Sequence, residues 1–457
     1  MQAALTALLL LGSCPALAFD NDRFTLSAGY ELGYDTNVFR LPSQAEAPQP
    51  TPGNSERGDQ LSAATIGIRY HGQIGRQAFE AGLVEVLYRY KTFRSLDHNA
   101  MASEARWVGE IGDSWRPLLE WTRSKNLAGF ADVRVPVRNI QTIDRLNMEL
   151  RYAVTPSWEA LSNLSGERHT NDAPEQAALD SRTRALELGI AHTPPTGNRV
   201  ELHLRYIDAR YPNSSVPFGL EGPSPGGLLD YVQKEVLVTG LYTPTGWGEI
   251  AWQIGYGARR YSVSDRNLDT PIGRLAYTWK PSDKTSLLAE YSRSIGDPWI
   301  GATVGPAAAT GSTGAPRPDG PPPVGAKAGP NSPPAPPSVT GAAASADMLS
   351  SLSNFAVNTV VRISPRWMPS SKTELRAHWE WWRRDFHGPF GIELPSTASV
   401  VTPAARDTTR TLGLSVAYNP WRTISVTLSW LSEHRRSSDP ALEFDANVYA
   451  VGLRAQF

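Results

Sequence analysis

Residues 145–152 read RLNMELRY, and polar and apolar side chains alternate in this stretch without exception. The even-numbered positions are Leu, Met, Leu and Tyr, and the odd-numbered positions are Arg, Asn, Glu and Arg. Because successive side chains of an extended chain point to opposite faces, this pattern predicts a β-strand with one apolar face and one charged face.

The same alternation recurs along the chain, for example in residues 200–206 (VELHLRY) and 374–381 (ELRAHWEW). Helical periodicity is almost absent. A face that carries Arg and Glu in succession is not the core of a soluble sandwich, although in such a fold it could still meet bulk water while the apolar face packs inward. The spacing of the strands therefore has to decide between a soluble sandwich and a membrane barrel.

The connections between these segments alternate between short and long, which is typical of antiparallel strands that cross a membrane. Eight short connections are expected at 72–76, 112–115, 155–158, 194–198, 244–247, 281–283, 364–371 and 419–421. Nine long ones are expected at 41–60, 94–102, 126–140, 169–180, 212–230, 263–270, 296–350, 387–406 and 436–442. These numbers predict an all-β fold, a transmembrane antiparallel β-barrel of about 18 strands with short periplasmic turns and long extracellular loops.

Tryptophan and proline mark the short connections. Indole is most stable where acyl chains meet headgroups, so an interfacial girdle is predicted from Trp115, Trp158, Trp247, Trp279, Trp367 and Trp421. A soluble sandwich with aromatic turn caps is the alternative. Proline lacks the backbone donor of a β-ladder, and strand ends are therefore expected at Pro156, Pro195, Pro244, Pro281, Pro365 and Pro420.

The two ends of the chain support export and membrane insertion. A short apolar run followed by Ala16-Leu17-Ala18 predicts a signal peptide over 1–18 and a barrel over 19–457. Acylation of Cys14 is the alternative, and cleavage after Ala18 would leave no cysteine for disulfides, thiolate catalysis or zinc. The last strand alternates apolar and other residues up to Phe457, a pattern that we expect the outer-membrane assembly machinery to recognise.

Composition excludes several classes of protein. The 457 residues carry a formal net charge of −1, without the basic excess that nucleic-acid binding needs. A mean hydropathy of −0.33 with 19% charged residues excludes a bundle of membrane helices, each of which needs about 20 apolar residues in succession. Partners are therefore expected to be outer-membrane lipid and a transported molecule, with no cofactor.

The polar strand faces are expected to line the barrel interior. Candidates for substrate contact are Arg69, Arg89, Arg145, Arg151, Arg205, Arg376, Glu149, Glu201, Glu374 and Glu380, and Glu85 is expected to point inward with them. The 37 Arg outnumber the 7 Lys, which favours planar, bidentate contact with carboxylate, phosphate or sugar hydroxyls. The alternative is that these arginines and glutamates neutralise one another across the wall.

Two further features bear on function. Residues 301–346 contain 11 Pro, 8 Gly and 12 Ala, which predicts a flexible extracellular loop that plugs the lumen, meets a partner or has no role. No catalytic or metal-binding motif is present, and His203 and His378 are interpreted as ordinary lumen residues. We therefore expect no enzymatic activity and no metal site.

The first mature strand ends in the sequence YDTNVFR at 34–40, and YRY at 88–90 and LDH at 96–98 follow later. This opening resembles that of exosortase-associated outer-membrane barrels linked to extracellular polysaccharide biosynthesis and export, the EpsL-like family. The resemblance implies a component that passes a polysaccharide chain together with periplasmic export components. Of the residues in the motif, Asp35, Asn37 and Arg40 are carried over, with an expected structural role.

Three functions follow as hypotheses. The first is export of extracellular polysaccharide through the outer membrane. The second is a general diffusion porin for small solutes, and the third is a non-conducting scaffold for surface polymer.

Overall fold

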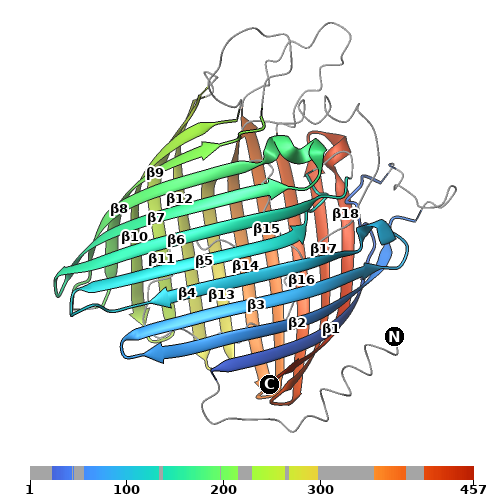
Figure 1. Cartoon of the computed structure of the whole chain (residues 1–457), viewed down its shortest axis with the longest axis horizontal. Coiled ribbons are helices and arrows are strands. Elements are labelled where there is room, and N and C mark those ends of the chain that lie inside the picture. The colour runs from blue at the N-terminus through green and yellow to red at the C-terminus, as the bar shows by residue number, and fades with distance from the viewer. Residues whose placement is uncertain are drawn as a thin grey trace, which may run out of the picture.

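Eighteen antiparallel strands form one sheet that closes on itself (Figure 1). The computed structural model describes residues 23–43, 45, 56–132, 137–195, 197–214, 229–262, 267–296, 355–387 and 406–457. The predicted signal peptide at 1–18, with Cys14, and the predicted flexible loop at 301–346 lie outside these residues. In the described part of the chain, no helix is both long and apolar enough to cross a membrane.

Each strand pairs with its neighbours in sequence, and β1 also pairs with β18. The closing pairs run from Ser27 opposite Gln456 to Asp35 opposite Val448. The strands are β1 (Phe24–Asp35), β2 (Asp59–Ile74), β3 (Gln77–Tyr90), β4 (His98–Val108), β5 (Trp115–Leu127), β6 (Ile140–Thr155), β7 (Trp158–Asn171), β8 (Ser181–His192), β9 (Arg199–Arg210), β10 (Tyr231–Thr245), β11 (Gly248–Tyr261), β12 (Leu268–Ser282), β13 (Thr285–Gly296), β14 (Phe355–Ser370), β15 (Thr373–His387), β16 (Arg406–Trp421), β17 (Ile424–Ser437) and β18 (Phe444–Gln456).

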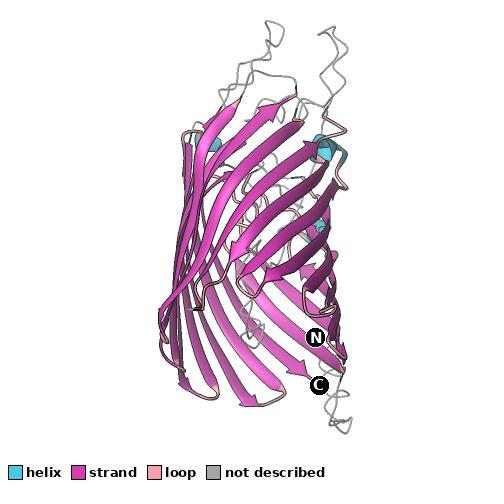
Figure 2. Cartoon of the chain, turned by 90° about the vertical axis from the view of Figure 1, so that its left-hand side faces the viewer, coloured by secondary structure: helices cyan, strands magenta, loops and turns pink. Residues whose placement is uncertain are grey.

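The strands are strongly tilted relative to the barrel axis, as closure of a sheet into a barrel requires (Figure 2). Short turns join the strands at one end. The long connections lie at the other end and contain the 3₁₀ helices η1 (Arg94–Leu96), η2 (Pro174–Leu179) and η3 (Pro440–Leu442). The predicted number of strands and the predicted alternation of connections are both confirmed.

The outer surface is mainly apolar, with aromatic rings at the short-turn end. All six tryptophans of the predicted girdle are exposed, from 40% for Trp279 to 66% for Trp247 and Trp421. Further along the strands the exposed residues are mainly aliphatic, such as Leu164 and Ile254. An outward apolar band of this kind is stable against acyl chains and not against water. The soluble sandwich is therefore excluded.

The strands do not end at every predicted proline. Pro244, Pro281, Pro365 and Pro420 lie inside β10, β12, β14 and β16, because each strand continues to the turn that follows. The register shifts around Pro244, Pro281 and Pro420, for example between Tyr418 and Trp421 on β16. On β14 the shift follows Pro365 and lies between Trp367 and Ser370. An irregular ladder tolerates a residue that cannot donate a hydrogen bond, so the sheet extends past the proline before it turns.

Candidate functional site: the barrel interior

The inner face of the wall is formed by the side chains that alternate with the exposed apolar ones. On β6, Leu146, Met148 and Leu150 are exposed to the outside, so Arg145 and Glu149 project inward. The structure places nine of the ten predicted contact residues on this inner face: Arg69, Arg145, Arg151, Arg205, Arg376, Glu149, Glu201, Glu374 and Glu380.

Arg89 is the exception, and its predicted inward orientation is wrong. On β3 the exposed Phe79 and Leu83 share the parity of Glu85 and Arg89, so all four side chains are on the outer face. The register agrees, because Glu85 pairs directly with the outward Ile66 of β2. The error arose because β3 carries charged residues on both faces, and the chain alone does not show which face meets lipid.

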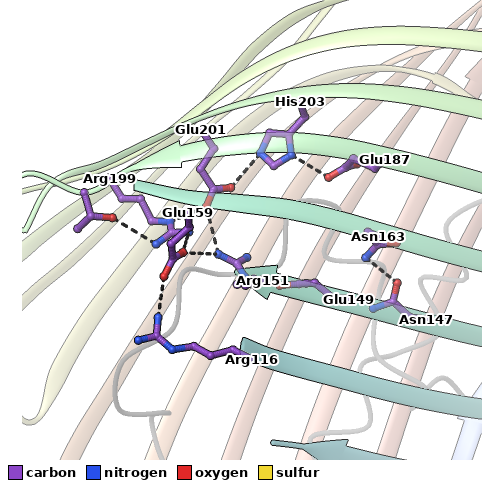
Figure 3. Close-up of polar contacts among 11 residues, drawn as sticks. Arg116, Asn147, Glu149, Arg151, Glu159, Asn163, Glu187, Arg199, Glu201 and His203 are labelled. Atoms are coloured by element: carbon purple, nitrogen blue, oxygen red, sulfur yellow. Dashed lines mark hydrogen bonds and ion pairs between the residues drawn. The ribbon is translucent and has the colours of Figure 1, made fainter. Parts of the chain in front are cut away.

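A network of charges covers the inner wall over β5 to β9 (Figure 3). Glu159 of β7 is its centre. One carboxylate oxygen accepts from Arg116 at 2.6 Å, and the other accepts from Arg199 at 2.6 Å and lies 3.8 Å from Arg151. Three guanidinium groups from three different strands therefore converge on one carboxylate.

The network continues upward along the wall through Glu201 and His203. Glu201 accepts from Arg199 at 2.5 Å and from Arg151 at 3.3 Å. The two ring nitrogens of His203 lie 2.9 Å from Glu201 and 2.9 Å from Glu187 (Figure 3). With both ring nitrogens occupied, His203 links two carboxylates and has no free nitrogen to act as a base.

The network extends to β11 through Arg205. This side chain joins Glu187 at 2.5 Å to Glu235 at 3.0 Å, and Gln233 donates to Glu235 at 2.5 Å. Arg259 of β11 then donates to Gln233 at 2.7 Å. A continuous ladder of polar contacts thus crosses the wall from β5 to β11.

The adjoining part of the wall repeats the same chemistry on β12 to β15. Arg274 contacts Glu290 at 2.7 Å, and Arg362 lies 3.8 Å from Glu290 and 2.6 Å from Glu380. Nearer the short turns, Arg366 and Arg376 share the carboxylate of Glu374. The ion pairs fit the alternative in which arginines and glutamates neutralise one another across the wall.

His378 lies in this wall beside a serine and a carboxylate, the three side-chain types of an acyl-transfer triad. Its Nδ1 is 3.0 Å from the hydroxyl of Ser364, but its Nε2 is 3.9 Å from Glu380. Glu380 instead accepts two hydrogen bonds from Arg362, at 2.9 and 2.6 Å. The carboxylate is therefore committed to the arginine and does not orient the imidazole as an acyl-transfer triad requires.

Asp35, Asn37 and Arg40 lie at the long-loop end of β1, where they form a local cap. Arg40 donates to Asp35 at 2.7 Å and to Glu433 of β17 at 2.9 Å. The side-chain amide of Asn37 accepts a hydrogen bond from the backbone N–H of Leu41 at 3.0 Å and donates one to the carbonyl of Leu41 at 2.8 Å. These contacts bind the loop to the wall. Burial alone would lower the pKa of the Arg40 guanidinium, but the two carboxylates raise it above its ordinary value.

Loop residues pack inside the mouth of the barrel next to this cap. Phe39, Phe93 and Phe130 come from the first three long connections, and their rings meet at centroid distances of 4.8 Å and 5.3 Å. They rest on the inward-facing Tyr88 and Tyr90 of β3. The apolar cluster therefore holds residues of three long connections against the inner face of β3.

The third of these loops, after β5, reaches the far wall. Asp132 lies 2.6 Å from Arg384 of β15 and 2.7 Å from Arg435 of β17, and both arginines also hold Asp407 at 2.8 and 2.5 Å. The side chains of Arg384 and Arg435 are only 2% exposed. We call Asp132, Arg384, Arg435 and Asp407 the latch.

The latch places two carboxylates against two guanidinium groups. Burial would raise the pKa of Asp132, yet Arg384 and Arg435 lower it to about 2. The carboxylate is therefore ionised at neutral pH, and it anchors the loop across the interior. None of the latch residues was predicted. Asp132 lies in an expected long connection next to Phe130, but nothing in the chain indicates a partner more than 250 positions away.

Among the residues that the structure describes, no group of three His, Cys, Asp or Glu side chains could hold a metal ion.

Comparison with known proteins gives similarity of fold only. No family model and no curated protein matches the chain. Among solved structures, the outer membrane protein opdK from Pseudomonas aeruginosa is 8% identical over 95% of this chain and 98% of that one, with a TM-score of 0.44. OccAB3 from Acinetobacter baumannii is 9% identical, over 95% and 99%, with a TM-score of 0.42. The FrpB iron transporter from Neisseria meningitidis is 10% identical, over 91% and 62%, with a TM-score of 0.42.

These findings correct the family prediction. No family model matches the chain, and the solved structures that resemble it have other names, among them an outer membrane protein and an iron transporter, so the predicted EpsL-like family is not supported. The physical reason lies in the motif. Asp35, Asn37 and Arg40 bind the first loop to the barrel wall, a task that is not tied to any transported molecule. The chain is a β-barrel of the bacterial outer membrane.

Proposed function

We propose that the protein is a diffusion channel for small hydrophilic solutes. The observation that carries the proposal is the combination of a polar, ion-paired inner wall with a loop that is latched across the interior. A barrel of 18 strands is wide enough to hold water when nothing fills it. A loop anchored through Asp132 to Arg384 and Arg435 restricts the passage, which favours small solutes over a polymer.

The solute would meet those interior arginines that remain most exposed. The side chain of Arg69 is 61% exposed, and those of Arg366 and Arg376 are 44% and 36% exposed. By contrast, the side chains of Arg151 and Arg205 are both 21% exposed, and each contacts more than one glutamate. Among the predicted contact residues, Arg69 and Arg376 are therefore the better placed to meet a solute.

Conductance tests the proposal directly. The mature protein, refolded and inserted into planar lipid bilayers, is expected to give discrete conductance steps in potassium chloride. Heat-denatured protein is the control and should give none. A correctly folded protein that conducts no ions would contradict the channel and favour the non-conducting scaffold.

Permeation of solutes of graded size tests the restriction. Liposomes that contain the protein should swell rapidly in monosaccharide and much more slowly in an oligosaccharide of the same osmolarity. Equal rates for both solutes would show that the latched loop does not limit passage.

A further inference from the structure

Charged residues on the outer face gather toward the long-loop end of the barrel. On β8, the outward Leu186, Leu188 and Ile190 are exposed, and the same face continues upward through Arg184 and Arg182. On β7, the outward Leu164 is followed four residues later by the exposed Arg168. Three arginines thus lie directly above a lipid-facing apolar surface.

The three side chains start close together, because β7 and β8 are adjacent strands (Figure 1). Arg168 is paired directly opposite Arg182. Directly opposite Cβ atoms are about 5 Å apart, and alternate residues of one strand are about 7 Å apart. The guanidinium groups of Arg168, Arg182 and Arg184 can therefore converge on a single small anion.

Asp144 of β6 and Asp208 of β9 are paired directly opposite Arg168 and Arg184, but no carboxylate of the described chain forms an ion pair with the three arginines. Asp144 lies 3.6 Å from Arg123 instead, and Asp208 lies 2.9 Å from Arg210. Several other outward arginines at this end are paired with carboxylates, for example Arg260 with Asp269 at 2.7 Å and Arg383 with Asp385 at 2.9 Å. Like charges placed directly opposite each other destabilise a sheet. An anion from outside the protein would remove this repulsion.

The acidic residues above the patch, toward the long loops, also have partners. Asp172 accepts from the backbone N–H of Ile140 at 2.5 Å and lies 3.6 Å from Arg138. Asp180 accepts hydrogen bonds from Asn171 and Asn213. Neither carboxylate is therefore free to neutralise the arginines.

The position of the patch identifies the anion. Arg182 is the second residue of β8, and β7 ends three residues after Arg168, so the arginines lie where the outer leaflet's headgroups meet the barrel. Guanidinium groups bind phosphate in a bidentate manner. The exposed Leu164 and Leu186 directly below offer an apolar surface for acyl chains.

We propose that Arg168, Arg182 and Arg184 bind the phosphate groups of a phosphorylated glycolipid in the outer leaflet. The proposal depends on the location of the barrel in the outer membrane and not on conduction, so it stands even if no ions pass.

Native mass spectrometry of the refolded mature protein in detergent tests the site. The probes are bisphosphorylated lipid A and the same lipid after enzymatic removal of its phosphates. The variant combines Arg168→Gln, Arg182→Gln and Arg184→Gln. The matched control combines Arg260→Gln, Arg383→Gln and Arg436→Gln, which are also outward and near the long loops but are paired with aspartates. Heat-modifiable migration in gels shows that each protein is folded.

The unmodified protein and the control variant are expected to bind the phosphorylated lipid equally. The Arg168, Arg182 and Arg184 variant should bind it on the order of 100-fold more weakly, since each basic residue near an anionic surface contributes about a factor of five. Binding of the dephosphorylated lipid should be weak and the same for all three proteins. Equal affinity of the test and control variants for the phosphorylated lipid would overturn the proposal, as would equal binding of the two lipids by the unmodified protein.

Discussion

Guanidinium and carboxylate groups on the inner wall form specific ion pairs. Glu159 receives three arginines, and Arg205 contacts two glutamates. Each partly exposed pair contributes at most about 1 kcal/mol to stability. Their larger effect is electrostatic, because the wall stays polar and hydrated without a large net charge, in agreement with the formal net charge of −1.

Glu159→Gln tests this balance. The substitution removes one negative charge where Arg116, Arg199 and Arg151 meet, so the local field becomes more positive. We expect the reversal potential in a potassium chloride gradient to shift toward the equilibrium potential of chloride, which indicates a higher permeability to anions. The control is Glu443→Gln at the end of η3, outside the strands. A shift toward potassium in the Glu159 variant, or an equal shift in the control, would contradict the role of Glu159.

Asp132→Ala tests the latch. The variant leaves Arg384 and Arg435 with a single carboxylate, Asp407. Removing one partner of a buried ion pair costs about 3 kcal/mol, which would raise the released fraction of the loop on the order of 100-fold. Single-channel conductance should increase, and proteases should cleave the loop faster.

Asp113→Asn is the matched control for the latch, because its carboxylate is 96% exposed in a short connection. It should leave both conductance and proteolysis unchanged. Unaltered conductance in the Asp132 variant, with a loop that has become sensitive to protease, would show that the loop does not limit the passage.

Acid should release the latch only at very low pH. Because the pKa of Asp132 is lowered to about 2, the latch stabilises the closed loop at all pH values above the ordinary pKa of aspartate, about 4. This stabilisation decreases as the pH falls from about 4 toward 2. The difference in conductance between the unmodified protein and Asp132→Ala should therefore be constant from pH 8 to pH 5. A difference that disappears above pH 5 would contradict the ionised state assigned to Asp132.

At the level of elements, the alternation of polar and apolar residues determines which face of a strand meets lipid. The pairing register with the neighbouring strand determines where the strand ends. The alternation in β6 and β9 correctly predicts which side chains point inward. In β3, charged residues occupy both faces, so the same rule did not place Arg89. The prolines of β10, β12, β14 and β16 show that proline does not reliably mark the end of a strand. A residue that breaks a regular ladder does not end a strand whose register can shift beside it.

Phe457→Ala separates assembly from stability at the last strand. The backbone of Phe457 exchanges two hydrogen bonds with Leu26, both 2.8 Å long, whereas the residue as a whole is 42% exposed. The substitution keeps the backbone bonds, so the refolded variant should melt in detergent at nearly the same temperature as the unmodified protein. Its amount in the outer membrane of cells should fall if the assembly machinery reads the terminal ring.

Leu453→Ala is the control for Phe457→Ala, because it shortens another apolar side chain of β18 and leaves the terminal ring in place. An equal fall in outer-membrane abundance for both variants would point to lost lipid contact and would refute recognition of Phe457.

For the molecule as a whole, closure between β1 and β18 is the defining contact. Ala28 is paired directly opposite Ala455, although the two residues are at opposite ends of the chain. Cα atoms of directly opposite residues are about 5 Å apart, a distance that a disulfide can span. Ala28→Cys with Ala455→Cys should therefore cross-link under oxidation, which a shift in migration of the denatured protein on non-reducing gels detects.

The offset pair Ala28→Cys with Val451→Cys is the control for closure. Val451 pairs with Leu32, four residues further along β1, so this pair should not cross-link. Cross-linking of the offset pair, or failure of the opposite pair in folded protein, would contradict the register of the closing strands.

The sequence by itself determined the strands, the order of short and long connections, the exposed aromatic girdle and most of the inward-facing charges. These features follow from the period of two of an extended chain and from the preference of each side chain for lipid or water, both of which act on neighbouring residues. Only the tertiary structure decided which charges pair, that the loops pack in the mouth, and that Asp132 meets Arg384 and Arg435 on the far wall. Those contacts depend on closure of the sheet, which brings together residues whose separation in sequence carries no local signal.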